Sequence, residues 1–244
     1  TAATQQARAA VRYVTAHAPP PDPANTVDIP FATDNFKAGE LIGKWAAGHM
    51  AGKPAVIAML DLFNDKVVSV DYNRDQGFLT GMGIDTADPK VNGDEAATGS
   101  YDGGDYTIVC NEPTNGAEDG GRTAMENCLQ KNPDINLVYT INEPAALGAY
   151  TALKAKGREK DVLIVSVDGG CTGTQAVKDG KIAATSQQYP LKMASQGVQA
   201  VVDYAKSGKK ASGYTDTGVN LITDKPQAGV TSKDTGFGLQ NCWG

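Results

Sequence analysis

Polar side chains follow three of the apolar runs in this sequence, at positions where they can bind one ligand together. Asn142 follows INLVYTI, Asp168 follows VLIVSV, and Gln188 is the second of the two glutamines that follow IAATS. Arg74 adds a cation in the stretch after PAVIAML. A carboxylate accepts paired hydroxyl hydrogen bonds, a guanidinium donates from a planar fork, and amides do both. This set of groups suits a neutral ligand that carries several hydroxyl groups.

Each of these residues also has a purely structural explanation. Asn142 can cap a helix, Asp168 can belong to a turn, and Arg74 can lie on a charged surface. The stretch SVDGGCTG raises the same choice, because two glycines fit an ordinary turn as well as a ligand clamp. It matches neither G-x-x-x-x-G-K-[ST] nor G-x-G-x-x-G, so a phosphate-binding loop is excluded. For SVDGGCTG, a ligand-binding loop and an ordinary turn both remain possible at this point.

The scaffold for these residues is an alternation of short apolar runs with helical patterns. Such alternation predicts βαβ units and a mostly parallel sheet that is buried on both faces. In a parallel sheet, ligands bind beyond the carboxyl ends of the strands, so we expect the polar residues to converge there. The predicted strands are 54–60, 106–110, 135–141, 162–167 and 182–186, and the predicted helices are 35–51, 66–82, 117–131, 143–156, 174–179 and 190–207.

Two segments depart from this alternation. Residues 84–105 are polar and glycine-rich, which predicts a surface loop; its acidic residues lack the spacing of a calcium-binding EF-hand. The first residues, TAATQQARAAV, predict an amphipathic helix with no strand before it. A sheet made of complete βαβ units rarely begins in this way.

Composition excludes several classes of function. The chain has 244 residues, enough for one large α/β domain or two lobes, and its formal net charge is −6 with 22 Lys and Arg. No basic run is present, so we expect neither a nucleic-acid partner nor an anionic membrane surface. No apolar stretch reaches the ~18–20 residues of a membrane span, so we expect no direct membrane insertion.

The cysteines and histidines argue against metal and enzyme sites. Four cysteines without a CxxC motif and only two histidines make a zinc site improbable, and no Ser-His or Cys-His pair is indicated. We therefore expect no metal, no cofactor and no enzymatic activity. An even number of cysteines fits two disulfides in an oxidising compartment, although four buried thiols would give the same pattern.

Five stretches carry a resemblance to a known family: TDNFKAGELIGKWAA, VDYNRDQGFLTGM, INEPAALGAYTALKAKG, LIVSVDGGCTGTQAVKDGKIAATSQQYP and CWG. They resemble bacterial periplasmic sugar-binding proteins of the ribose and fructose type, which feed ABC transporters. The resemblance implies a type I α/β fold in which parallel sheets flanked by helices form two lobes that close on a monosaccharide. It also implies sugar-binding roles for Arg74, Asn142, Asp168 and Gln188.

The resemblance also implies where the lobes divide. It predicts a partial first lobe of residues 1–34 plus 189–222, and a complete second lobe of residues 35–187 plus 223–244. The opening segment of the family's first lobe has no counterpart here, and Ala18 stands where the family has an aspartate. The resemblance therefore implies sugar-binding residues mainly for the second lobe and fewer for the first.

The function that the resemblance implies is capture of a pentose or ketohexose between the lobes, for delivery to an ABC permease. The protein would be a monomer in the periplasm or outside the cell, with its signal peptide either removed or lying outside this sequence. The alternative is the effector domain of a sugar-responsive repressor, which shares the fold. This alternative lacks support in the chain, which contains no helix-turn-helix or basic segment.

The same resemblance leads to a predicted disulfide between Cys171 and Cys242. The closing CWG belongs to the lobe that carries SVDGGCTG, and a terminal tail frays unless something ties it down. Closing a loop of about 70 residues would stabilise the fold by roughly 4 kcal/mol on the chain-entropy model. Cys110 and Cys128 are candidates for a second bridge. Buried free thiols remain the alternative for both pairs.

Overall fold

The computed structural model describes residues 15–16, 30–210 and 212–244. The chain folds into two compact units. Unit 1 comprises residues 1–34, 188–219 and 243, and unit 2 comprises residues 35–187, 220–242 and 244. The helix expected at the N-terminus and the position of Ala18 lie outside the described residues. The assignment of these units to a first and a second lobe stays a prediction.

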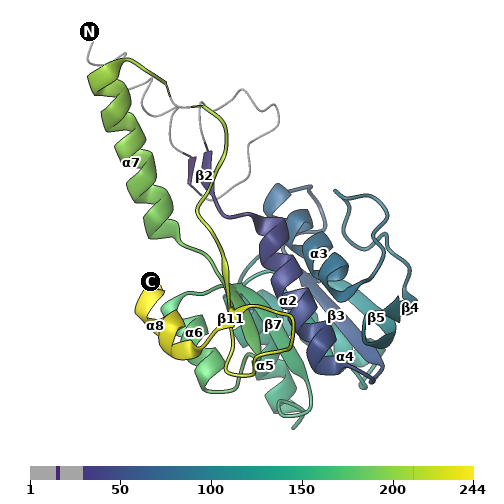
Figure 1. Ribbon diagram of the computed structural model, residues 1–244. Coiled ribbons are helices and arrows are strands. Elements are labelled where there is room, and N and C mark those ends of the chain that lie inside the picture. Colours follow the sequence, from purple (N-terminus) through teal and green to yellow (C-terminus); the bar gives the residue numbers. More distant parts are fainter. Residues whose placement is uncertain (1–14, 17–29, 211) are drawn as a thin grey trace. The chain divides into compact units, whose positions relative to one another are not determined.

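Unit 2 is built on one sheet with the strand order β11-β10-β8-β7-β6-β3-β5-β4 (Figure 1). The pairings between β5, β3, β6, β7 and β8 are all parallel, as the strand–helix alternation predicts. Antiparallel pairs extend this core on both sides, through β4 beside β5 and β10 beside β8. The strands are β3 (Ala55–Asp61), β4 (Thr98–Tyr101), β5 (Gly104–Pro113), β6 (Leu137–Thr140), β7 (Leu163–Asp168), β8 (Ala184–Gln187), β10 (Asn220–Ile222) and β11 (Ser232–Lys233).

Helices cover both faces of this sheet. Leu60, Val138 and Ile164 belong to a core cluster with residues of α4, α5 and α6. Side chains alternate between the faces of a strand, so Tyr139 points the other way, and its ring packs against Phe78 of α3. The helices of unit 2 are α2 (Asn35–Met50), α3 (Ser69–Met82), α4 (Glu118–Lys131), α5 (Glu143–Ala155), α6 (Cys171–Lys178) and α8 (Thr235–Asn241).

Helices α2 and α3 approach each other closely through glycines. A Cβ atom at Gly39 would lie 2.0 Å from the carbonyl oxygen of Arg74, and one at Gly77 would lie 2.1 Å from that of Phe36. Only glycine allows backbones to come this near. The contact fixes the turn of α3 that carries Arg74 directly against the start of α2.

The segment 84–105 is not entirely the surface loop expected from its composition. Residues 98–101 form β4, an antiparallel edge strand in which Ser100 pairs with Asp105. The hydroxyl of Tyr101 donates to the carbonyl oxygens of Met50 and Lys53, which anchors the hairpin. The backbone hydrogen bonds of an exposed edge strand need no apolar side chains, so polar composition did not distinguish this strand from a loop.

Both cysteine pairs are joined by disulfides. Cys110 to Cys128 connects β5 to α4 within the core, with a sequence separation of 18 residues. Cys171 to Cys242 connects the first residue of α6 to the residue after α8, with a separation of 71 residues. The second bridge therefore ties the C-terminal tail to the SVDGGCTG stretch, and it closes the longer loop.

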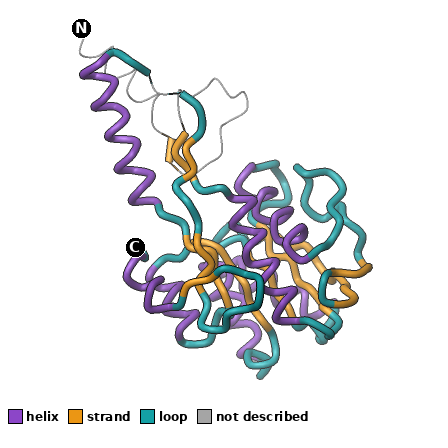
Figure 2. The backbone as a smooth tube through the Cα atoms, in the orientation of Figure 1, coloured by secondary structure: helices purple, strands orange, loops and turns teal. Residues whose placement is uncertain are grey.

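Unit 1 contains a small parallel sheet with the order β1-β2-β9 and the long helix α7 (Figure 2). Phe31 of β2 and Met193 of α7 are buried together. Gly208 ends α7 in a left-handed conformation with φ of 66°. No helix in the described part of the chain has the length and apolar character needed to cross a membrane. The elements of unit 1 are β1 (Thr15–Ala16), β2 (Pro30–Ala32), α7 (Pro190–Ser207) and β9 (Thr215–Asp216).

Candidate ligand-binding site

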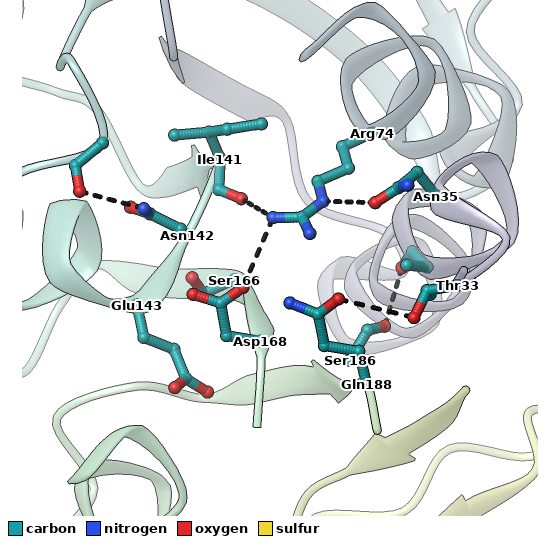
Figure 3. A network of polar contacts seen from close by, with 12 residues as sticks. Thr33, Asn35, Arg74, Ile141, Asn142, Glu143, Ser166, Asp168, Ser186 and Gln188 are labelled. Atoms are coloured by element: carbon teal, nitrogen blue, oxygen red, sulfur yellow. Dashed lines mark hydrogen bonds and ion pairs between the residues drawn. The ribbon is translucent and has the colours of Figure 1, made fainter. Parts of the chain in front are cut away.

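Arg74 lies at the centre of a polar network in unit 2 (Figure 3). It is 5% exposed, its Nε donates to Asn35 Oδ1 at 2.9 Å, and its Nη1 donates to the carbonyl oxygen of Ile141 at 2.8 Å. Nη1 also lies 3.5 Å from Asp168 Oδ1. Among the described residues, none accepts a hydrogen bond from Nη2. The guanidinium is thus held rigidly through Nε and Nη1 and keeps its Nη2 donors for a further acceptor.

Asp168 is the last residue of β7, and its backbone is unusual. Its φ is 147°, which non-glycine residues rarely adopt, and Gly169 follows with φ of 69°. The Asp168 side chain is 15% exposed and faces the Arg74 guanidinium (Figure 3). A carboxylate in this position can accept hydrogen bonds from two hydroxyl groups while the arginine neutralises its charge.

Glu143 provides a second carboxyl group, directly behind the turn that follows Asp168. It is 4% exposed, and its Oε1 accepts from the Gly169 amide at 2.8 Å and from the Thr185 hydroxyl at 2.7 Å. Its Oε2 accepts from the Gly170 amide at 3.0 Å. Burial and the negative charge of Asp168 raise the pKa of Glu143 to about 8, although the three hydrogen bonds oppose this shift.

Asn142 has the structural role that its position allowed. Its Oδ1 accepts from the Ala145 amide at 3.1 Å, which caps α5, and its Nδ2 donates to the carbonyl oxygen of Gly116 at 2.9 Å. Asn142 therefore fixes the start of α5 against a neighbouring loop. A role in ligand binding is an additional property, for which each of its polar atoms retains one hydrogen-bonding position.

The two glutamines at the end of β8 belong to different units. Gln187 is buried in unit 2, where its Nε2 donates to the carbonyl oxygens of Gly169 and Gly238 at 2.9 and 3.0 Å. Gln188 begins the second segment of unit 1, where its Oε1 accepts from the Thr33 hydroxyl at 3.4 Å (Figure 3). The structure thus brings Arg74, Asn142 and Asp168 into unit 2 and assigns Gln188 to unit 1.

A separate pair of buried carboxyl groups lies on the α3 side of the sheet. Asp61 ends β3 and Asp75 follows Arg74 on α3; they are 3% and 0% exposed. No described residue donates to Asp61 Oδ1 or to Asp75 Oδ2. Burial and the charge of Asp71 raise the pKa of Asp61 to about 8, and burial and the charge of Asp61 raise the pKa of Asp75 well above its usual value. The described residues hold no group of three or more acidic, His or Cys side chains arranged for a metal ion.

Sequence reasoning missed two contributors to this site, Asn35 and Glu143, whereas Gln187 is the first of the two amides that the sequence places after IAATS. Asn35 and Glu143 stand at helix starts, where polar residues serve as caps or favourable first-turn charges, so their types carried no further signal. The available signal was positional. Both lie within one residue of an element boundary at the carboxyl edge of the sheet, as do the predicted ligand residues Asn142, Asp168 and Gln188.

Comparison with known proteins identifies the fold family. Residues 1–210 match the periplasmic binding protein domain. The chain belongs to this family. It is 30% identical to the ribose import binding protein RbsB of Salmonella typhimurium over 191 residues, which cover 78% of this chain and 56% of that protein. It is also 30% identical to RbsB of Bacillus subtilis over 199 residues, 82% of this chain and 57% of that protein. The chain spans just over half the length of these relatives.

Solved structures agree with this family assignment. A galactofuranose binding protein superimposes with a TM-score of 0.67 at 25% identity, covering 80% of this chain and 61% of that one. A solute binding protein from Actinobacillus succinogenes with bound D-allose gives a TM-score of 0.69 at 22% identity, covering 82% and 63%. The type I periplasmic binding protein fold expected from the resemblance is confirmed, and the relatives named above are described as binding proteins for ribose and for galactofuranose.

Proposed function

We propose that this chain is the sugar-binding part of an extracytoplasmic receptor that captures a pentose or ketohexose and delivers it to an ABC permease. In this proposal it is a monomeric binding protein and not an enzyme, as the names of its relatives imply for them. Capture between two lobes, with Gln188 contributing from unit 1, belongs to the same proposal.

The observation that carries the proposal is the pairing of Arg74 with Asp168 at the carboxyl edge of a parallel sheet. The arginine offers Nη2 donors, and the aspartate offers acceptor positions, within one rigid network. A sugar presents neighbouring hydroxyl groups that act as donors and acceptors at once, so it matches this set better than an anion or a cation would. Asn142, at the start of α5, adds donor and acceptor positions beside them.

Two features support an extracytoplasmic location. Disulfides persist in oxidising compartments, and both cysteine pairs of this chain are bridged. The net charge of −6 disfavours binding to nucleic acids, which an alternative role in transcription would require. The word import in the names of the relatives supports the proposed delivery to a permease.

Calorimetric titration with D-ribose, D-allose and D-fructose tests the proposal. We expect Asp168→Ala to weaken binding of the best ligand by about 30- to 1,000-fold, equivalent to roughly 2–4 kcal/mol, because buried sugar hydroxyls lose their acceptor. Asp179→Ala, at the other end of α6, serves as the control and should leave affinity unchanged. Equal affinities of Asp168→Ala and the parent chain would refute the assignment of this site.

A further inference from the structure

The turn after β7 holds Asp168 in a conformation that its own residue type disfavours. A non-glycine residue at positive φ is strained and persists only where its surroundings fix it. Gly169 is constrained as well, because a Cβ atom there would lie 2.3 Å from Gln187 Cβ and its φ is 69°. The direction of the Asp168 carboxylate therefore depends on whatever restrains the next two peptide groups.

Glu143 supplies that restraint. Its two carboxyl oxygens accept from both amides of the turn, Gly169 at 2.8 Å and Gly170 at 3.0 Å. Gly170 is the N-cap residue of α6, so the carboxyl group also lies where the positive end of a helix dipole favours negative charge. Gln187 holds the carbonyl oxygen of Gly169 from the other side at 2.9 Å.

The residues around Glu143 pack closely against its carboxyl group and leave no space for a larger neighbour. A Cβ atom at Gly173 would lie 1.9 Å from the Glu143 carboxyl carbon, so the first turn of α6 needs glycine there. Thr185 of β8 donates to Oε1 at 2.7 Å. The side chain starts from the first residue of α5, next to Asn142, and Figure 3 shows it pointing away from the Arg74 guanidinium. Glu143 is thus placed behind the ligand-facing residues and does not join them.

We propose that Glu143 is the positioning residue of the site, which fixes the Gly169–Gly170 turn and thereby aims the Asp168 carboxylate at the ligand. The inference rests on the proposed function, since it gives Asp168 the role of sugar acceptor. It predicts that sugar affinity depends on a side chain that does not touch the sugar.

Two variants of Glu143 test the inference by graded loss. Glu143→Met keeps the length of the side chain and removes both acceptors, whereas Glu143→Gln keeps one. We expect the affinity for the best of D-ribose, D-allose and D-fructose to fall at least tenfold in Glu143→Met, with partial rescue in Glu143→Gln. The matched control is Glu118→Met, an exposed glutamate that is likewise the first residue of its helix, and it should stay within twofold of the parent chain.

A positioning role is separated from a general effect on stability by the Asp168→Asn background. If Glu143 acts through Asp168, Glu143→Gln should change the affinity of Asp168→Asn by less than twofold. Full additivity of the two substitutions would overturn the inference. If Glu143→Met fails to fold, Thr185→Val removes one donor to Glu143 without changing side-chain shape, and it should weaken binding only when Asp168 is intact.

Amide hydrogen exchange, measured by NMR without any sugar, makes the test independent of the proposed function. The Gly169 and Gly170 amides should exchange at least tenfold faster in Glu143→Met than in the parent chain, and Glu143→Gln should affect mainly one of them. Unchanged exchange at both glycines would refute the positioning role. By contrast, unchanged sugar affinity in Asp168→Ala would refute the proposed function and leave the exchange result standing.

Discussion

Unit 2 contains two carboxyl sites that are equally buried and differently partnered. Glu143 receives three donors, two from backbone amides and one from a hydroxyl group. In the Asp61–Asp75 pair, one oxygen of each residue has no donor among the described residues, and negative charge from Asp71 lies beside Asp61 and from Asp61 beside Asp75. Burial raises the pKa in both places, to about 8 for Glu143 and for Asp61.

The two sites differ in the groups that surround each carboxyl group once it has lost its proton. Ionised Glu143 meets donors that are already in position, so its charge leaves the surrounding turn intact. Ionised Asp61 and Asp75 would place two negative charges in contact without a donor for either free oxygen, so one of them must keep a proton. Burial alone therefore does not define the role of a carboxyl group. That role depends on the number of hydrogen-bond donors that face the carboxyl oxygens.

The largest expected effect separates the two sites by stability. Glu143→Met leaves three donors without an acceptor, and it should lower the free energy of unfolding by about 3 kcal/mol at pH 7. Asp75→Asn introduces a donor opposite Asp61, so it should change stability by less than about 1 kcal/mol, or raise it. Urea denaturation followed by circular dichroism measures both. Equal losses in the two variants would show that the donors around Glu143 do not make its role different from that of Asp75.

The pH dependence of stability should show the proton held by the buried carboxyl groups. Their folded-state pKa values are raised, so their contribution is complete below the unfolded pKa of about 4 and disappears as the pH rises through about 8. Each such group should lower the free energy of unfolding by about 1.4 kcal/mol per pH unit in this window. Thermal denaturation between pH 5 and pH 9 measures this slope.

Asp61→Asn should flatten this slope by about one proton, since the variant no longer has a proton to release at this position. Asp65→Asn is the matched control, because Asp65 is an exposed aspartate in the loop after the same strand. A slope that is identical in Asp61→Asn and in the parent chain would show that the pair does not hold a proton in the folded state.

The smallest expected effect concerns Asn142, which precedes Glu143 on α5. Asn142→Ala removes the helix cap and should lower the free energy of unfolding by about 1 kcal/mol, without altering the pH slope. Exchange at Gly169 and Gly170 should remain slow, because Glu143 still accepts from both amides. Faster exchange there would assign control of the turn to the helix start as a whole rather than to the Glu143 carboxyl group.

Much of the fold was predictable from the sequence because its cause is local. Apolar runs, together with residues typical of helix starts and ends, located the five central strands and their helices to within a few residues. Asn142 is the helix cap that its position allowed. The edge strand β4 was not predictable, since its pairing is made by backbone groups while its side chains are polar.

In the candidate site, too, the residues with local causes were predictable and those that depend on distant partners were not. Asn142 and Asp168 could be named from their places at strand ends and Arg74 from the helical stretch that follows a strand, and their sugar-binding roles stay predictions. Glu143 could not be named, because its partners lie 26 to 42 residues away and depend on a glycine that makes room for it. A buried acceptor of this kind becomes visible only when the donors around it have coordinates.

The tail strand β10 gives unit 2 a particular order of assembly. It lies beside β8, with Asn220 opposite Gln187, although the residues between them build α7 and β9 of unit 1. The chain emerges with its N-terminus first, from the ribosome and from an export channel alike, so the 33 residues after Gln187 must follow β8 before that edge can pair. At the synthesis rate of about 5–20 residues per second, these residues take roughly two to seven seconds to emerge. Throughout that interval the nascent sheet presents an open edge, so chaperones and foreign strands compete for it before its own tail arrives.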